Sequence, residues 1–180
     1  MPYGALLRFC LCGYFFLGII AIIFPPLMPQ IIAHFGLGLA SAGLVFPAKA
    51  VGSLLGNLFS GITSDVVGRK PLLVGGALLQ AVGLGLSAAA GSWPVFLIGF
   101  VMMGFSQGAV SAAINALVVD LSGENRGRAL NLLHGVYSIG AALSPVVIAL
   151  VLGSGRHWRE IFASAAFAWL ILGGAALILS

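Results

Sequence analysis

Charged side chains are scarce in this sequence: 8 lysines and arginines and 4 aspartates and glutamates make up 7% of 180 residues. Soluble domains carry roughly 25% charged residues, so this composition excludes an ordinary soluble globular protein. Hydrophobic residues account for 61% of the chain and lie in long uncharged runs. A membrane-spanning helix needs about 20 mainly apolar residues, and these runs can supply several such helices.

Cysteine and acidic residues are also scarce. Cys10 and Cys12 lie in the first apolar run, where we interpret them as small apolar residues because neither a disulfide framework nor a metal site is plausible there. The four acids lie at loops or at the ends of apolar runs, and no cluster of histidines, cysteines and acids has the spacing of a metal or catalytic site. We therefore expect no metal, no cofactor and no enzyme activity.

Clusters of proline and glycine divide the apolar runs into helices. Phe24–Gln30 (FPPLMPQ) and Ala88–Phe96 (AAAGSWPVF) interrupt two runs that are too long for single spans. The apolar stretches are continuous rather than alternating, which predicts helices rather than the strands of a membrane barrel. We expect an all-α membrane protein in which residues 1–180 form one six-helix bundle. The predicted spans are residues 6–24 (or 6–33, if the first helix continues past the prolines), 40–62, 71–90, 93–119, 129–152 and 157–179.

The basic residues are distributed unequally between the two ends of these spans. With a cytoplasmic N-terminus, five bases lie at the inner ends and two in the outer loops. Positive charge stays on the cytoplasmic side during insertion, so this orientation is favoured, and we expect it in the plasma membrane. The bases are spread singly among apolar spans, which argues against nucleic-acid binding. The inner bases are Arg8, Arg69, Lys70, Arg126 and Arg128, and the outer ones are Arg156 and Arg159.

Gly61–Pro71 (GITSDVVGRKP) concentrates charge and glycine in the short turn after the second predicted span. Gly61 and Asp65 are one helical turn apart, which places a glycine surface beneath a carboxylate at the membrane boundary, where another helix can approach closely. Gly68 lets the chain reverse. Pro71 suits the first position of the next helix.

The segment GITSDVVGRK resembles the loop motif G-x-x-x-D-x-x-G-R-K/R of the major facilitator superfamily in position, spacing and charge. The resemblance implies a secondary active transporter that moves a small polar solute by alternating access. It also implies that the aspartate holds the positive end of a helix in the other half of the molecule and so latches one of two states, which agrees with helix-dipole physics. The residues matching this conformational latch are Gly61, Asp65, Gly68, Arg69 and Lys70.

Three further segments resemble the same family. DLSGENRGRA (120–129) is similar to the charged loop after the fourth helix, which can pair with the first motif across the cytoplasmic face. WREIF (158–162) is similar to the Trp-Arg pair where the sixth helix begins. NLLHGVYSIGAALSP (131–145) resembles the fifth helix of the fucose-permease-like branch, although the acids of the sugar/proton symporter have no counterpart here. The implied cytoplasmic charge partners are Asp120, Glu124, Arg126 and Arg128.

Members of this family usually have twelve helices in two related halves, each a 3+3 inverted repeat, with the substrate bound between the halves. This sequence matches one half. We expect it to be the N-terminal half of a longer product, since Leu179–Ser180 follows the sixth span directly, or to pair with a second copy or another chain. The expected partners are a small-molecule substrate, the lipid bilayer and a second six-helix half or chain, with no nucleic acid.

Polar residues recur at helical spacing inside three predicted spans. Such groups are costly in lipid unless they face protein or a water-filled cavity, so their phase predicts where a cavity lies. The third and sixth spans have no comparable stripe, which agrees with the implied arrangement of helices one, two, four and five around a central path. A single serine or asparagine is also compatible with helix–helix bonding. The candidate cavity-lining residues are Lys49, Ser53 and Asn57, then Gln107, Ser111 and Asn115, then His134, Tyr137 and Ser138.

Lys49 is the only charged residue near the middle of a predicted span. An ammonium group there costs roughly 2.5–3.5 kcal/mol on insertion scales. No acid of this sequence lies at the same depth, so we expect its partner to be an anionic substrate or an acid in the missing half, unless the lysine is neutral. The glycine pairs Gly52/Gly56 and Gly104/Gly108 predict close helix packing.

The main alternative to a transporter is a non-transporting membrane scaffold, or a subunit that pairs with a second six-helix chain. A scaffold has no need of polar stripes on three helices, which favours the transporter. The sequence names neither the substrate nor the coupling ion.

Overall fold

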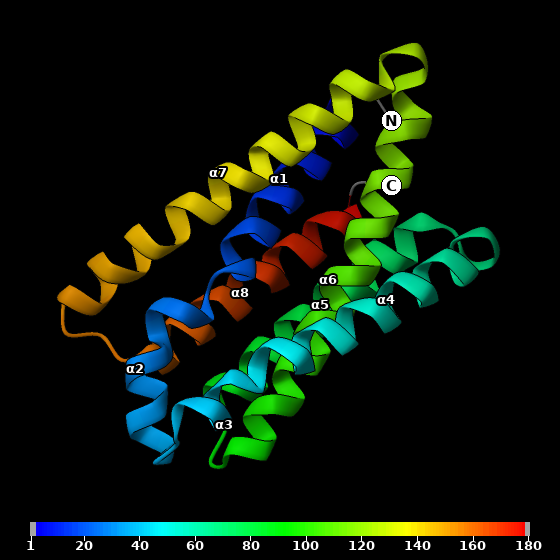
Figure 1. The fold of residues 1–180 in the computed structure, drawn as a ribbon. Helices are drawn as coiled ribbons and strands as arrows, with labels where there is room; N and C mark the ends of the chain where they lie inside the picture. Colours follow the sequence, from blue (N-terminus) through cyan, green and yellow to red (C-terminus); the bar gives the residue numbers. More distant parts are fainter. Residues whose placement is uncertain (1–2, 179–180) are drawn as a thin grey trace.

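The computed structural model describes residues 3–178, except for the side chains of Tyr3, Ala5, Asp65 and Ile178. Every regular element in this range is a helix (Figure 1). The elements are α1 (Tyr3–Ala21), α2 (Phe24–Phe35), α3 (Leu39–Gly43), α4 (Val45–Val67), α5 (Arg69–Ala89), α6 (Trp93–Ser122), the 3-10 turn η1 (Gly123–Asn125), α7 (Arg126–Gly153) and α8 (Trp158–Ile178).

The first predicted span is two helices in the structure. The chain breaks between Ala21 and Phe24, and the axes of α1 and α2 differ by 42°. Pro25 and Pro26 lie in the first turn of α2, where a missing N–H is tolerated, but they prevent α1 from continuing through them. The chain is therefore helical past the prolines, as far as Phe35, but this part is a separate helix, α2, and not a continuation of α1.

A glycine turn reverses the chain between α4 and α5. Gly68 has φ +82°, which side chains rarely adopt, and its N–H donates to Ser64 O at 3.1 Å. The following helix begins at Arg69, two residues earlier than expected. Pro71 thus takes the third helical position rather than the first. A proline is tolerated at either position, because the N–H groups of the first helical turn have no partner within the helix.

Within the described residues, four helical segments are long and apolar enough to cross a membrane, and the bent pair α1–α2 makes a fifth if it is one span. One of these segments, Trp93–Gly153, has 61 residues. It contains α6 and α7, and the chain reverses between them at η1 (Figure 1). At about 1.5 Å per residue each helix exceeds the roughly 30 Å hydrocarbon core. The chain is an integral, multi-pass membrane protein.

Glycines bring two helix pairs, α4–α6 and α1–α7, into backbone contact. A methyl group added at Gly52 would overlap Val101 O of α6, and one at Gly104 would overlap Lys49 O of α4. Gly56 and Gly108 are equally close to the facing backbone. The predicted close packing of these glycines is confirmed, and Gly18 and Gly140 play the same part between α1 and α7.

An aromatic cluster joins α2, α6 and α8. In Figure 1, α2 and the starts of α6 and α8 lie at the end of the bundle opposite the turn between α4 and α5. Beside the cluster, Arg159 ties the start of α8 to two other helices. Its guanidinium donates to Ala88 O at 2.5 Å and Ala90 O at 2.7 Å, and to His34 Nε2 at 2.9 Å. These carbonyls end α5, where helical bonding leaves them free. The cluster contains Phe24, Phe35, Trp93, Phe96, Phe100, Trp158 and Phe162.

Candidate functional site

A polar cavity of about 170 Å³ lies between α1, α4, α6 and α7. Gln107, at the middle of α6, places it near the middle of the bundle. Six of its nine lining residues come from the predicted polar stripes, and α5 and α8 supply none of the nine. The lining residues are Tyr14 and Leu17 of α1, Ser53 and Asn57 of α4, Gln107, Gly108 and Ser111 of α6, and His134 and Tyr137 of α7.

Tyr14 is the centre of a hydrogen-bond network that joins α1 to α6. Its hydroxyl lies 2.7 Å from Ser111 Oγ and accepts a hydrogen bond from Asn115 Nδ2 at 2.5 Å. The Asn115 amide nitrogen also lies 3.4 Å from Ser111 Oγ. Asn115 Oδ1 is buried and has no partner among the described residues, so this network leaves one acceptor unpaired beside the cavity.

The other wall of the cavity joins α6 to α7. Gln107 Nε2 donates to the Tyr137 hydroxyl at 3.4 Å. The Tyr14 ring lies 5.7 Å from the His134 ring and 6.0 Å from the Tyr137 ring, centroid to centroid. The lining therefore presents phenol, amide, hydroxyl and imidazole groups and no carboxylate. Such a surface can exchange hydrogen bonds with a neutral polar solute.

Two predicted residues lie beside the cavity rather than in its lining. Asn115, one turn along α6 from Ser111, belongs to the Tyr14 network. Ser138 is exposed, and its hydroxyl donates to His134 O of its own helix at 2.9 Å. Neither position needs a solute to satisfy its hydroxyl or amide donor.

Lys49 has a partner that the sequence analysis did not consider. Its ammonium group donates to the carbonyl oxygens of Ile20 at 3.4 Å and Ala21 at 3.2 Å. These carbonyls belong to the last turn of α1, where the helix dipole is negative and the break before α2 leaves the Ile20 oxygen only a turn bond from Ile23 N–H at 3.4 Å. Lys49 is thus placed at the α1–α2 break and not among the nine cavity-lining residues.

The residues of the expected latch lie at the end of α4 and the start of α5. A methyl group at Gly61 would meet none of the described atoms within 4 Å, so the glycine surface is open toward that part of the chain. Arg69 forms an ion pair with Asp120 of α6, and Lys70 Nζ donates to Leu177 O of α8 at 3.1 Å. The backbone of Asp65 lies in α4, whereas its side chain lies outside the described residues.

The expected charge partners lie around η1. Asp120 meets Arg69, but both side chains are partly exposed, and such pairs typically contribute only about 0–1 kcal/mol to stability. Glu124, Arg126 and Arg128 are exposed and form no ion pair in the part of the chain that the structure describes.

Comparison with known proteins identifies the family. The family model described as "Major Facilitator Superfamily" matches residues 10–180. This chain belongs to the major facilitator superfamily. It is 31% identical over 136 residues to "Uncharacterized MFS-type transporter YfkL" of Bacillus subtilis, a match that covers 76% of this chain and 34% of the relative. It is 29% identical over 126 residues to "Multidrug resistance protein MdtL" of Shewanella oneidensis, covering 69% of this chain and 32% of the relative.

The major facilitator fold is also evident in a solved structure, that of the proton:xylose symporter XylE bound to 6-bromo-6-deoxy-D-glucose. The two superpose with a TM-score of 0.87 at 18% identity, over 98% of this chain and 44% of that one. At this identity the likeness shows the fold alone. The chain spans about a third of the length of the curated relatives above, and its fold fits one half of a major facilitator transporter.

Tyr14 is the functional candidate that sequence reasoning missed. The predicted stripes consist of polar residues that repeat every four positions, and Tyr14 belongs to no such repeat. The sequence feature that indicates Tyr14 is its phenol hydroxyl, which lies deep in an apolar span and needs a hydrogen-bond partner there. Leu17 and Gly108 were missed because neither is polar.

Proposed function

We propose that this protein is a secondary active transporter, or one half of one, that moves a small polar solute across a membrane by alternating access. The observation that carries the proposal is the polar cavity, which four helices of an otherwise apolar bundle line at mid-depth. The names of two relatives, "Uncharacterized MFS-type transporter YfkL" and "Multidrug resistance protein MdtL", support the same class. They are transporters, which supports an absence of enzyme activity here.

The proposed topology has six spans, with the N-terminus in the cytoplasm and the protein in the plasma membrane. In it α1–α2, α3–α4, α5, α6, α7 and α8 each cross once. The five inner bases against two outer ones favour this orientation. It places the turn at Gly68 and η1 on the cytoplasmic side, and Arg159 with its helix-end partners on the outer side.

Solute binding in this account is by hydrogen bonds to neutral groups. Asn57 and His134 are exposed on the cavity wall, while Gln107 and Tyr137 already contact each other there. None of the nine lining residues is an acid, so a carboxylate that takes up coupling protons would have to come from another half or chain.

A second six-helix half, or a second chain, is the partner that completes this cavity. The apolar faces of α4 and α7 support it, because both are unusually exposed in the described chain. Gly61 supports it as well, since its open surface admits a helix that this chain does not supply. In the proposed latch, Asp65 holds the positive end of that helix in one of two states. The exposed apolar residues include Leu54, Leu58 and Ile62 of α4 and Ile139, Val146 and Leu150 of α7.

Uptake into proteoliposomes tests the proposal. The chain is reconstituted alone, and with the following residues if its reading frame continues past Ser180. Radiolabelled D-xylose, D-glucose and a panel of neutral polar solutes are then offered with and without a proton gradient. Saturable uptake of any of them supports a transporter, and its loss in Gln107→Leu places the path in the polar cavity. Folded, reconstituted protein that carries none of the panel would favour the scaffold.

A further inference from the structure

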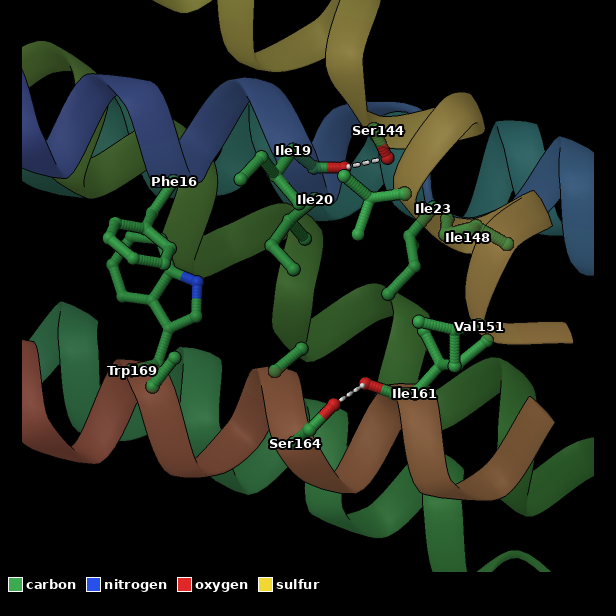
Figure 2. Close-up of a pocket in the computed structure, with 13 residues that line it drawn as sticks. Phe16, Ile19, Ile20, Ile23, Ser144, Ile148, Val151, Ile161, Ser164 and Trp169 are labelled. Atoms are coloured by element: carbon green, nitrogen blue, oxygen red, sulfur yellow. Dashed lines mark hydrogen bonds between the residues drawn. The ribbon is translucent and has the colours of Figure 1, made fainter. Parts of the chain in front are cut away.

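A second cavity, of about 220 Å³, lies between α1, α7 and α8 (Figure 2). It is on the opposite face of α1 from Tyr14. Its walls are almost entirely hydrocarbon, with Ile19, Ile20 and Ile23 of α1 facing Ile148 of α7 and the alanines of α8. An apolar cavity of about 150 Å³ can hold benzene, so this one has room for a ring with a short substituent.

The two hydroxyl groups in the cavity wall are already engaged. Ser144 Oγ donates to Ile19 O at 2.8 Å, and Ser164 Oγ donates to Ile161 O at 3.0 Å. Figure 2 shows both bonds directed at helix backbone rather than into the cavity. Neither serine therefore has a free proton to offer a ligand.

Trp169 is different, because its indole N–H is buried and has no partner in the described part of the chain. The side chain is only 2% exposed. In Figure 2 the indole nitrogen lies on the edge of the ring that faces the cavity. Trp93 and Trp158 also have unpartnered indole nitrogens, but they are packed in the aromatic cluster. Trp169 thus holds an unpaired donor in the wall of an apolar space, and the acceptor of a ligand reaches it once the neighbouring side chains shift.

The depth of this donor limits what can reach it. Trp169 lies about 16 Å along α8 from its start, near the middle of the hydrocarbon layer. Water and lipid ester groups are concentrated at the interfaces, and acyl chains offer no hydrogen-bond acceptor. Leaving an N–H unpaired at this depth is costly. An occupant that satisfies it must dissolve in the bilayer and carry its own acceptor.

A cavity of about 400 Å³ between α4, α5 and α6 provides a contrast. Its only hydroxyl, that of Thr63, donates to Phe59 O at 2.5 Å, and no side-chain nitrogen is among its lining residues. Acyl chains can fill such a space without leaving a donor unpaired. An acyl chain in the Trp169 cavity, by contrast, would leave the indole N–H unpaired.

We propose that the cavity between α1, α7 and α8 binds a membrane-dissolved ligand made of a small apolar ring with one carbonyl-type acceptor, which accepts the Trp169 indole N–H. Aryl ketones and quinones have this chemistry. The site is separate from the polar cavity, and it does not depend on the proposed transport function.

The test is NMR of the chain in lipid nanodiscs with ¹⁵N-labelled indole groups, titrated with acetophenone. Its three tryptophans give three indole signals, and Trp169→Phe assigns one of them. Acetophenone should shift the Trp169 signal downfield and saturably while the other two stay in place. α-Methylstyrene, which has the same shape without the oxygen, should give no downfield shift. Ala165→Leu, which fills the cavity, should abolish the response.

A direct binding measurement guards against a variant that fails to fold. Trp169→Phe keeps a six-membered aromatic ring but removes the N–H together with the rest of the five-membered ring, so it should bind tritiated acetophenone up to about tenfold more weakly. Equal affinity in this variant would overturn the proposal. So would an equal shift of all three indole signals, which indicates partition into the bilayer only, or the same response to α-methylstyrene.

Discussion

The Tyr14 hydroxyl takes part in more side-chain hydrogen bonds than any other group that lines the polar cavity. The phenol is 2% exposed and meets both Ser111 and Asn115 of the facing helix. Removing the hydroxyl would leave the partly buried Asn115 amide nitrogen with a single long contact to Ser111, and a buried donor without a good partner costs about 1–3 kcal/mol.

Tyr14→Phe should therefore destabilise the protein by about 1–3 kcal/mol. Tyr137→Phe is the matched control, since its hydroxyl has one contact of 3.4 Å and should matter less. Unfolding in a detergent of fixed composition measures both. Equal losses for the two variants would show that the Tyr14 network has no special importance.

A substitution at Lys49 distinguishes a structural role of this residue from a role in solute binding. Its ammonium group bonds the last carbonyls of α1, and hydrogen bonds to charged groups typically contribute about 1.5–3 kcal/mol. Lys49→Met should lower stability and raise hydrogen exchange around residues 20–24, while uptake per folded molecule keeps its KM. Unchanged exchange combined with a raised KM would instead assign Lys49 to the solute, which is one of the two charged partners that the sequence predicts.

These residues also show what sequence alone could yield at this scale. Serines, asparagines and glutamines spaced by four reveal a polar face, because lipid penalises such groups wherever they are unpaired. The partner of Lys49 could not be found in the same way. It is a pair of backbone carbonyls, and Lys49 can reach them because α1 ends at Ala21 and α2 begins only at Phe24.

Among the elements, the pair α4–α6 depends on glycine for its contact. A methyl group at Gly104 would overlap the Lys49 carbonyl oxygen, whereas one at Gly85 of α5 would meet no atom within 4 Å. Gly104→Ala should therefore destabilise the chain by about 1–3 kcal/mol through overpacking. Gly85→Ala, which only improves helix propensity, should be neutral or stabilising by up to about 1 kcal/mol. Similar thermal stability of the two variants would contradict the observed packing.

Element type was predictable because apolar runs broken by proline and glycine leave few options in lipid. The break between α1 and α2 was harder to predict from the sequence. Phe24–Gln30 carries three prolines, and prolines in a first helical turn and prolines inside a helix look alike in sequence. The early start of α5 has a similar cause, since Pro71 is tolerated anywhere in the first turn.

At the scale of the whole molecule, the Gly61–Lys70 turn is proposed to bias one of two arrangements of this half against another. Asp65→Asn should slow uptake several-fold while insertion and thermal stability remain near those of the wild type, because the charge acts in one state only. Thr63→Ala, on the same helix, is the control, since its hydroxyl bonds only within α4. Uptake by Asp65→Asn equal to that of the control, at equal expression, would make the motif simply a turn.

The central claim is that the polar cavity opens alternately to the two sides of the membrane, and two-sided accessibility of Asn57 tests it most directly. Asn57→Cys is placed in a background of Cys10→Ala and Cys12→Ala, and a membrane-impermeant thiol reagent is added from either side of sealed vesicles. Alternating access predicts labelling from both sides, suppressed by the transported solute, with Asp65→Asn altering the ratio between sides. Ser164→Cys, in the apolar cavity, should not be labelled. Labelling of Asn57→Cys from one side only, unaffected by solute or by Asp65→Asn, would contradict the account.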